Sequence, residues 1–154
     1  MNTDCISEFN GDYRWLSNFW PVEVVLDGET YPSIEHAYQA AKTLPEHREQ
    51  FKHCTAGQAK RLGRRVPMRP EWEDIKIAVM RDLIQQKFTF GSELGEDLLR
   101  TSPMTLVEGN SWGDTFWGVC DGVGQNHLGL LLMEQRNTLN DIEEELFYLY
   151  GNKN

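Results

Sequence analysis

Residues 33–42, Ser-Ile-Glu-His-Ala-Tyr-Gln-Ala-Ala-Lys, contain side chains whose types and spacing could carry out chemistry. On a helix, Glu35, Gln39 and Lys42 stand at i, i+4 and i+7, so a carboxylate, an amide and an ammonium form one stripe. Ser33 is suited to cap this helix, which places Glu35 in the first turn, where the helix dipole favours a carboxylate. The stripe could bind a sugar phosphate and assist chemistry on it. It could also be a solvated face with a weak charge pair, and the stripe alone favours that alternative.

Positive charge is concentrated in one short segment of an acidic chain. The net charge is −9, which argues against a general nucleic-acid binder held by phosphate contacts. The basic cluster consists of Lys60, Arg61, Arg64, Arg65 and Arg69. Such a cluster suits a small anionic ligand, or it is a solvated helix face. For phosphate, the candidate donors are Lys42, Lys60 and Arg64, and Arg64 offers a planar fork that matches phosphate oxygens.

The composition is that of one ordinary globular domain spanning residues 1–154, with 40% hydrophobic and 25% charged residues. The sequence lacks the basic start and apolar run of a signal peptide, and its longest apolar run, 128–133, is too short to cross a bilayer. We therefore expect no membrane association. Cys5, Cys54 and Cys120 are odd in number and widely spaced, which predicts a reducing cytoplasm and neither a disulfide framework nor a metal site.

The expected elements follow from local signals. Asp27-Gly28 predicts a hairpin over 22–31. Thr55 and Gln58 form a capping box for a helix over 55–62, which Gly63 is able to close. Further helices are expected at 33–44, 46–53, 70–88, 93–101 and 126–148, with a brief strand at 104–108.

The glycine-rich segment 109–124 breaks this pattern. A loop of this length is usually functional or disordered, and Trp112 and Trp117 argue against disorder because they need something to pack on. We interpret the segment as an ordered binding loop in which Trp117 stacks on a ligand. Trp72 is a second candidate wall, with core packing at the start of a helix as an equal alternative.

Several motifs, in their order and spacing, resemble the YbiA-like or NADAR (NAD and ADP-ribose associated) superfamily from about residue 8 to 140. They are Leu16-Ser-Asn-Phe19, Tyr31-Pro-Ser-Ile-Glu35-His36-x-x-Gln39-x-x-Lys42, Ala59-Lys-Arg-Leu-Gly-Arg64, Trp72-Glu, Leu106-Val-Glu108, Asp114-x-x-Trp117-Gly118 and Asn126-x-Leu-Gly-x-Leu-Leu-Met-Glu134-x-Arg136. The resemblance implies an α+β, predominantly helical YbiA-like fold with a small antiparallel β element. It also implies N-glycosidase chemistry on ribosyl compounds. One branch hydrolyses ribosylamino intermediates of the riboflavin pathway, and another removes ADP-ribose from guanine.

Cleavage of a C–N bond at a ribose anomeric carbon passes through an oxocarbenium-like transition state. Two carboxylates can serve it, one stabilising the cation and the other moving a proton. Our hypothesis is that Glu35 and Asp114 are this pair, with the division of roles left open. Neither metal nor cofactor is expected.

Further candidates complete the predicted binding site. The family motifs add Phe19, Gln39 and Glu108, and Asn18 and Asn126 could hold ribose hydroxyls. For Asn126, helix capping is the favoured alternative. His36 is expected to be a packed histidine that takes no part in proton transfer.

Two other classes of function stay open at this point. The chain could be a binding module that recognises ADP-ribose or NAD without turning it over. It could also act on ADP-ribosylated DNA or RNA, in which case the net charge predicts that recognition rests on the modification itself.

Overall fold

The computed structural model describes residues 4–151. The chain forms two compact units. The α1 unit is Asn10–Lys87, and the α5 unit combines Met1–Phe9 with Phe88–Asn154. Each unit contains some of the predicted site residues.

In the α1 unit, the predicted hairpin is confirmed. Strands β2 (Val24–Leu26) and β3 (Glu29–Tyr31) pair antiparallel, with Val24 opposite Tyr31. Asp27 and Gly28 both have positive φ, 49° and 80°, as a two-residue type I′ turn requires.

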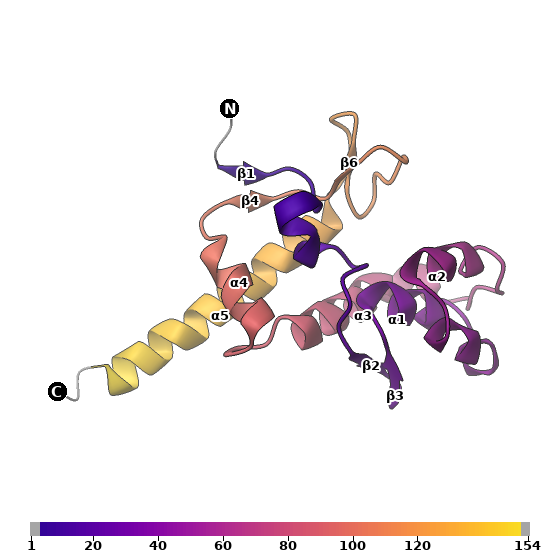
Figure 1. Cartoon of the computed structure of the whole chain (residues 1–154), viewed down its shortest axis with the longest axis horizontal. Helices are drawn as coiled ribbons and strands as arrows, with labels where there is room; N and C mark the ends of the chain where they lie inside the picture. The colour runs from indigo at the N-terminus through magenta and orange to yellow at the C-terminus, as the bar shows by residue number, and fades with distance from the viewer. Residues whose placement is uncertain (1–3, 152–154) are drawn as a thin grey trace. The chain divides into compact units, whose positions relative to one another are not determined.

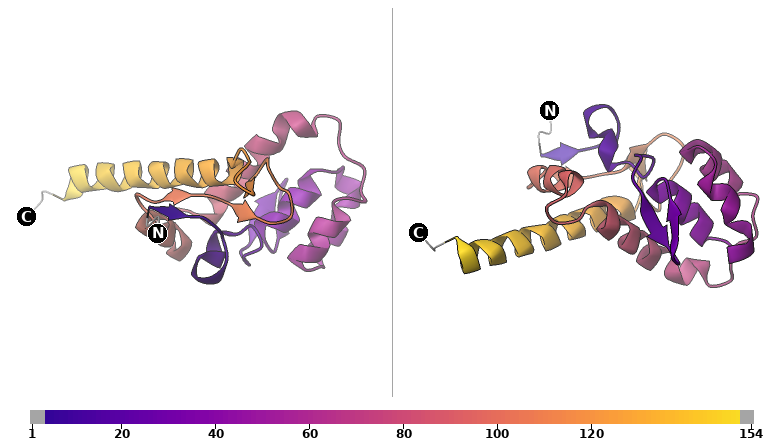
Figure 2. Two further views of the ribbon diagram at one scale, coloured as in Figure 1. Left: turned by 90° about the horizontal axis from the view of Figure 1, so that it is seen from above. Right: turned by 60° about the horizontal axis from the view of Figure 1, so that its bottom comes forward.

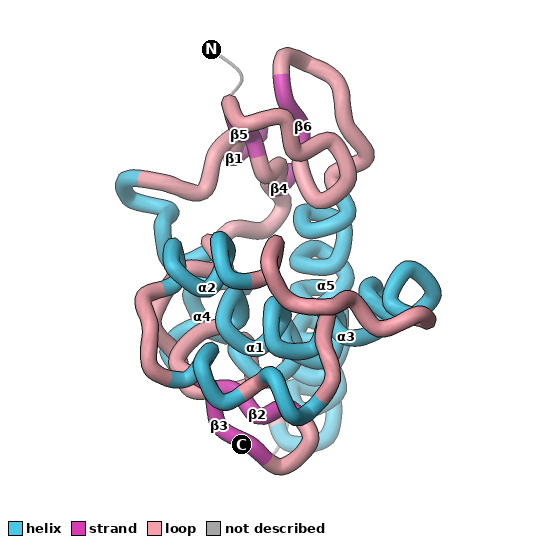
Figure 3. The backbone as a smooth tube through the Cα atoms, turned by 90° about the vertical axis from the view of Figure 1, so that its right-hand side faces the viewer, coloured by secondary structure: helices cyan, strands magenta, loops and turns pink. Residues whose placement is uncertain are grey.

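Helix α1 (Ile34–Ala41) is the central element of the α1 unit, and all eight of its residues are buried. It contacts α2 (Ala56–Leu62), α3 (Trp72–Lys87) and the hairpin, an arrangement visible in Figures 1 and 3. Ser33 caps it as predicted, because its Oγ accepts a hydrogen bond of 3.3 Å from the amide of His36. The result is a helix whose position is set by packing on several sides.

Short elements connect these helices. The predicted capping box is confirmed, since the side chains and amides of Thr55 and Gln58 bond reciprocally. The predicted helix at 46–53 is wrong in type, because two 3₁₀ segments, Pro45–His47 and Glu49–Lys52, stand in its place. A further 3₁₀ segment, Gly11–Leu16, opens the unit.

The α5 unit is organised along the long helix α5 (His127–Tyr150), which packs on α4 (Glu93–Arg100) and on strand β4 (Thr105–Leu106). Strand β1 (Cys5–Ile6) pairs with β4 in parallel, and β5 (Gly109–Asn110) pairs in parallel with β6 (Val119–Cys120). Figure 2 shows α5 as one continuous helix whose last turns extend beyond α4 and β4. The predominantly helical α+β fold is therefore confirmed, and the two parallel pairs are additions to the predicted antiparallel element.

The start of α5 corrects one prediction. Asn126 has a left-handed backbone, with φ of 55°, and its side chain makes no capping bond to the helix. Instead its Oδ1 accepts from the amide of Glu108 at 3.0 Å and its Nδ2 donates to the carbonyl of Leu106 at 2.9 Å. The left-handed residue turns its side chain towards the strand end, so Asn126 ties β4 to the helix.

Within residues 4–151, every helix is too short or too polar to span a bilayer.

Candidate active site

The acid on α1 is buried rather than solvated. Glu35 is 8% exposed and Gln39 is 5% exposed. The Gln39 Nε2 donates a hydrogen bond of 2.8 Å to Glu35 Oε1, so the carboxylate and the amide one helical turn later hold each other. The solvated-face alternative is therefore wrong for these two residues.

The Leu16–Phe19 motif lies at the start of α1. The carbonyl of Asn18 accepts a hydrogen bond of 3.0 Å from the amide of Glu35, and so satisfies one of the donors that a helix leaves open at its N-terminus. The Asn18 side chain donates to the sulfur of Met80 at 3.7 Å. Phe19 is 43% exposed, and its amide donates to Ser17 Oγ at 3.1 Å. The motif thus fixes the backbone around the acid, and ribose binding by Asn18 stays a prediction.

Lys42 stands in a field of mixed charge. Burial lowers the pKa of Lys42 and the Glu35 carboxylate acts to raise it. Arg64 and Lys76 lower it further, and Glu73 acts to raise it. The third residue of the predicted stripe therefore interacts with the first, and two more cations lie near enough to repel it. An anionic ligand would relieve this repulsion. Lys76, paired with Glu73 at 2.6 Å, was absent from the predicted set. In the sequence, Lys76 could have been identified by its position four residues after Trp72, one turn later in the same helix.

Two basic candidates lie at and after the end of α2. Lys60 is half-buried within the helix, whereas Arg64 is exposed and follows it. As predicted, Gly63 closes the helix, although with an ordinary helical φ of −58°. The turn continues beyond it, since the amide of Arg64 donates to the carbonyl of Arg61 at 3.2 Å.

Trp72 is a core residue in this structure. It is 2% exposed, and its ring packs against that of Tyr38 with centroids 5.1 Å apart. The Lys42 ammonium lies 5.9 Å from the centroid of the same Tyr38 ring. The packing alternative describes Trp72, because an indole covered in this way offers no face to a ligand. Tyr38 is the aromatic ring beside Lys42, and the predicted set did not include it.

His36 is packed, as expected. Its Nδ1 lies 2.6 Å from Ser33 Oγ, and its Nε2 lies 2.7 Å from the carbonyl oxygen of Cys54. Both ring nitrogens are used in holding the start of α1 to the segment before α2.

In the α5 unit, Asp114 organises the glycine-rich loop. Its Oδ1 accepts hydrogen bonds from the amides of Phe116 at 3.1 Å and Trp117 at 2.9 Å. Its own amide donates to Asn110 Oδ1 at 3.0 Å, and Asn110 Nδ2 donates to the Asp114 carbonyl at 2.8 Å. The loop is therefore ordered by side-chain bonds around Asp114. Asn110 was missed in the sequence because a lone Asn in a loop carries no specific signal.

Glu108 lies at the base of the same loop. Its carbonyl accepts a hydrogen bond of 2.9 Å from Val119, and its Oε2 accepts one of 3.4 Å from Asn110 Nδ2. A side chain at Gly118 would come within 2.7 Å of that Nδ2 and closer still to Glu108. Gly118 is thus required for the close approach of the loop's two ends.

Trp117 is half-buried among aromatic rings. It meets Phe116 edge-on, with centroids 4.9 Å apart, and His127 with centroids 6.3 Å apart. Its indole is held in place by neighbours, as a stacking surface needs to be, and stacking on a ligand stays a prediction.

The predicted residues thus form two groups. In the α1 unit, interactions connect Asn18, Glu35, Gln39, Lys42 and Arg64. In the α5 unit, Asn110 connects Glu108 with Asp114 by hydrogen bonds. Asn126 bonds directly to Glu108, and Trp117 bonds directly to Asp114. Each unit therefore contributes one of the two predicted acids.

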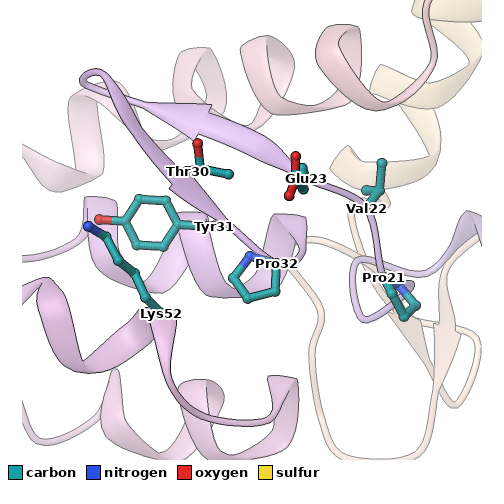
Figure 4. A pocket seen from close by; sticks show the side chains of 7 residues that line it. All are labelled: Pro21, Val22, Glu23, Thr30, Tyr31, Pro32 and Lys52. Atoms are coloured by element: carbon teal, nitrogen blue, oxygen red, sulfur yellow. The ribbon is translucent and has the colours of Figure 1, made fainter.

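A pocket of about 450 Å³ opens beside the hairpin, and none of the predicted site residues lines it (Figure 4). Of its two charged side chains, Lys52 already pairs with Glu29 and, at 3.0 Å, with Glu49. The other charged side chain, Glu23, is exposed, so the pocket lacks a buried carboxylate like the one on α1, and volume alone does not make it the site. The lining residues are Pro21, Val22, Glu23, Thr30, Tyr31, Pro32 and Lys52.

In the part of the chain that the structure describes, no three His, Cys, Asp or Glu side chains gather closely enough to hold a metal ion.

Comparison with known proteins gives a consistent set of similarities. The NADAR domain model matches residues 7–140. The N-glycosidase YbiA of Escherichia coli (strain K12) is 43% identical over 135 residues, which cover 83% of this chain and 82% of that protein. An N-glycosidase of Nostoc punctiforme is 32% identical over 138 residues, covering 84% and 88% of the two chains.

Two further similarities extend this set. A riboflavin biosynthesis protein of Vibrio vulnificus is 38% identical over 136 residues, which are 84% of this chain and 36% of that protein. Among solved structures, the NMR structure of Escherichia coli YbiA matches with a TM-score of 0.78 and 35% identity, covering 94% of this chain and 93% of that one.

Proposed function

This chain belongs to the NADAR family, and we propose that it hydrolyses the C–N bond between a ribose and a base or amine. The class of reaction follows the names of its relatives, several of which are N-glycosidases. The substrate class is a ribose phosphate or an ADP-ribosyl compound.

The observation that carries the proposal is the buried acid on α1. Glu35 is 8% exposed, accepts a hydrogen bond from Gln39 at 2.8 Å and lies in the same electrostatic field as Lys42. A buried carboxylate is costly unless it is held by donors and opposite charge. A fixed carboxylate beside a cation is the arrangement that a ribosyl oxocarbenium with a phosphate tail would need.

We assign phosphate binding to the cations near this acid. Burial lowers the pKa of Lys42, and the exposed Arg64 guanidinium lowers it further. A phosphate between such groups would receive charge-assisted hydrogen bonds and remove the repulsion. Lys60, half-buried on α2, is the third proposed donor.

Asp114 is the proposed second acid. One of the two carboxylates stabilises the developing ribosyl cation, and the other takes the proton of the attacking water or delivers one to the leaving nitrogen. Trp117 is proposed to stack on the leaving base, and Asn18, Phe19, Glu108 and Asn126 to line the ribose site. Hydrogen bonds from two backbone amides hold Asp114 Oδ1, so the carboxylate has a fixed orientation.

A substrate panel with one matched variant tests the proposal. Wild type and Glu35→Gln are incubated with ribosylamino intermediates of the riboflavin pathway and with ADP-ribosylated guanosine. Released base and ribose product are then separated chromatographically. We expect turnover of one class by wild type and a loss of at least about a hundredfold in the variant, since general acid–base catalysis contributes about 10²–10⁴. Full activity in Glu35→Gln would remove Glu35 from the mechanism.

Binding of ADP-ribose, measured by isothermal titration calorimetry, distinguishes this proposal from the alternative that the chain is a binding module without catalytic activity. Binding without turnover of any panel compound would favour recognition of ADP-ribose or NAD alone. Turnover of ADP-ribosylated guanine within DNA, with weak binding of plain DNA, would extend the substrate to modified nucleic acid. The net charge of −9 is the reason to expect weak contact with the polymer itself.

The proposal includes two further points, a single domain and a reducing compartment. The family model runs from residue 7 to 140 and so takes in most of both units, which supports one domain over residues 1–154. The three widely separated cysteines favour a reducing compartment such as the cytoplasm.

A further inference from the structure

Gly63 closes α2, but its backbone does not require glycine. Its φ is −58° and its ψ is −21°, which any residue adopts at the end of a helix. Alanine would even be favoured at such a position, because glycine loses more conformational freedom on folding. The reason for glycine at position 63 must therefore lie in its surroundings.

The surroundings of Gly63 are filled by one side chain. A methyl group added to Gly63 would come within 2.7 Å of Gln39 Cδ and closer still to Gln39 Oε1. Gly63 is itself buried, and Gln39 is 5% exposed. The amide of Gln39 thus occupies the space in which a side chain at position 63 would lie.

The orientation of that amide is set by the acid. A carboxylate only accepts hydrogen bonds, so the Gln39 NH₂ group must face Glu35, and its Nε2 donates to Glu35 Oε1 at 2.8 Å. Gln39 Oε1 then points towards Gly63. This oxygen is buried and accepts no hydrogen bond from the described residues, which is an unfavourable arrangement for a polar atom. The fold keeps an unpaired acceptor against Gly63 while the donor end of the same amide holds Glu35.

We propose that Gly63 is a positioning residue for Glu35: by lacking a side chain, it lets Gln39 keep its amide against the carboxylate. The inference rests on the proposed function of Glu35. It extends the site to a residue whose nearest neighbour on this side is Gln39 and not the acid itself. Substitution of Gly63 would act through Gln39, because the far end of that side chain yields more readily than the backbone.

The test compares Gly63→Ala with Gly57→Ala as a matched control. Gly57 lies in α2, and the nearest atom to an added methyl group there is 4.0 Å away. We expect Gly57→Ala to keep the wild-type kcat. Gly63→Ala should fold and lose about tenfold or more in kcat with KM changed less than threefold, because a hydrogen bond to a charged group contributes a factor of about 10–100.

The double variant Gln39→Ala with Gly63→Ala then separates positioning from general damage. Once the amide is removed, the added methyl group has nothing to displace, so the double variant should have the kcat of Gln39→Ala alone. Wild-type kcat in Gly63→Ala would overturn the inference. So would losses that multiply in the double variant, or a Gly63→Ala protein that does not fold.

Glu35→Gln, measured with the same substrate, tells the two proposals apart. If that variant is fully active, the proposed function of Glu35 fails. If it is inactive while Gly63→Ala matches wild type, only the positioning role of Gly63 fails.

Discussion

Substituting Asp114 by Asn and by Ala separates two roles of its carboxylate, shaping the loop and carrying charge. Its Oδ1 accepts from two amides, those of Phe116 at 3.1 Å and Trp117 at 2.9 Å. Asparagine keeps an Oδ1 acceptor and removes the charge. Alanine removes both.

The expected stability changes follow from these two bonds. Asp114→Ala leaves two amides in a half-buried loop without their acceptor, so we expect a loss of about 1–3 kcal/mol in the free energy of unfolding. In a chain of this size that corresponds to a fall of about 3–9 °C in Tm. Asp114→Asn should cost less than about 1 kcal/mol, because only the charge assistance of the two bonds is lost.

The two variants should differ less in turnover than in stability. If the carboxylate acts in catalysis, Asp114→Asn loses about 10²–10⁴ in kcat although its Tm stays near that of wild type. Thermal unfolding and chromatographic product release, measured on the same preparations, give both quantities. An Asp114→Asn protein with kcat within threefold of wild type would refute the catalytic role and leave Asp114 as a loop residue. A wild-type Tm in Asp114→Ala would refute the structural role.

Three further predictions concern other residues. Burial lowers the pKa of Lys87 from the usual 10.5 to about 7, so between these values the unfolded chain binds more protons and the free energy of unfolding rises with pH. This rise in the free energy of unfolding begins near pH 7, is complete near pH 10.5 and has a slope of at most about 1.4 kcal/mol per pH unit. Lys87→Met should lose it in urea unfolding between pH 7 and 10, and an unchanged slope would contradict the assignment. Lys42→Gln should raise KM for a phosphate-bearing substrate about 10–100-fold in steady-state kinetics, and an unchanged KM would exclude Lys42 from phosphate binding. Asn110→Ala removes both side-chain bonds to Asp114, so we expect a Tm about 3 °C or more below that of wild type, and an unchanged Tm would show that the loop holds its shape without them.

Local chemistry made several elements predictable from the sequence. Asp27-Gly28, Ser33 and the pair Thr55 and Gln58 act on atoms within a few residues, so their hairpin turn and helix caps form as expected. The same holds for the adjacency of Glu35 and Gln39, which a helix places one turn apart.

Other features depend on partners far away in the chain. Strand β1 pairs with β4, about a hundred residues later in the chain. Strands of two residues have no periodicity from which this pairing could be predicted. Asn126 has the residue type of a cap, but its partners at Leu106 and Glu108 lie about twenty residues earlier. Gly63 was expected to close a helix and does, yet the close approach of Gln39 is what excludes a side chain there.

The burial of the α1 side chains could not be predicted from the sequence either. The spacing of Glu35, Gln39 and Lys42 is equally compatible with an exposed charged face and with an interior one. Only packing of α1 against its neighbours decides between them, and it buries the first two residues.

The most direct test of paired catalysis is a double-mutant cycle on kcat/KM with Glu35→Gln and Asp114→Asn. Residues that act as one catalytic unit are strongly non-additive, so we predict that the double variant loses little more than the more damaged single variant. Losses that multiply, or wild-type kcat/KM in either single variant, would contradict the pairing of these two acids.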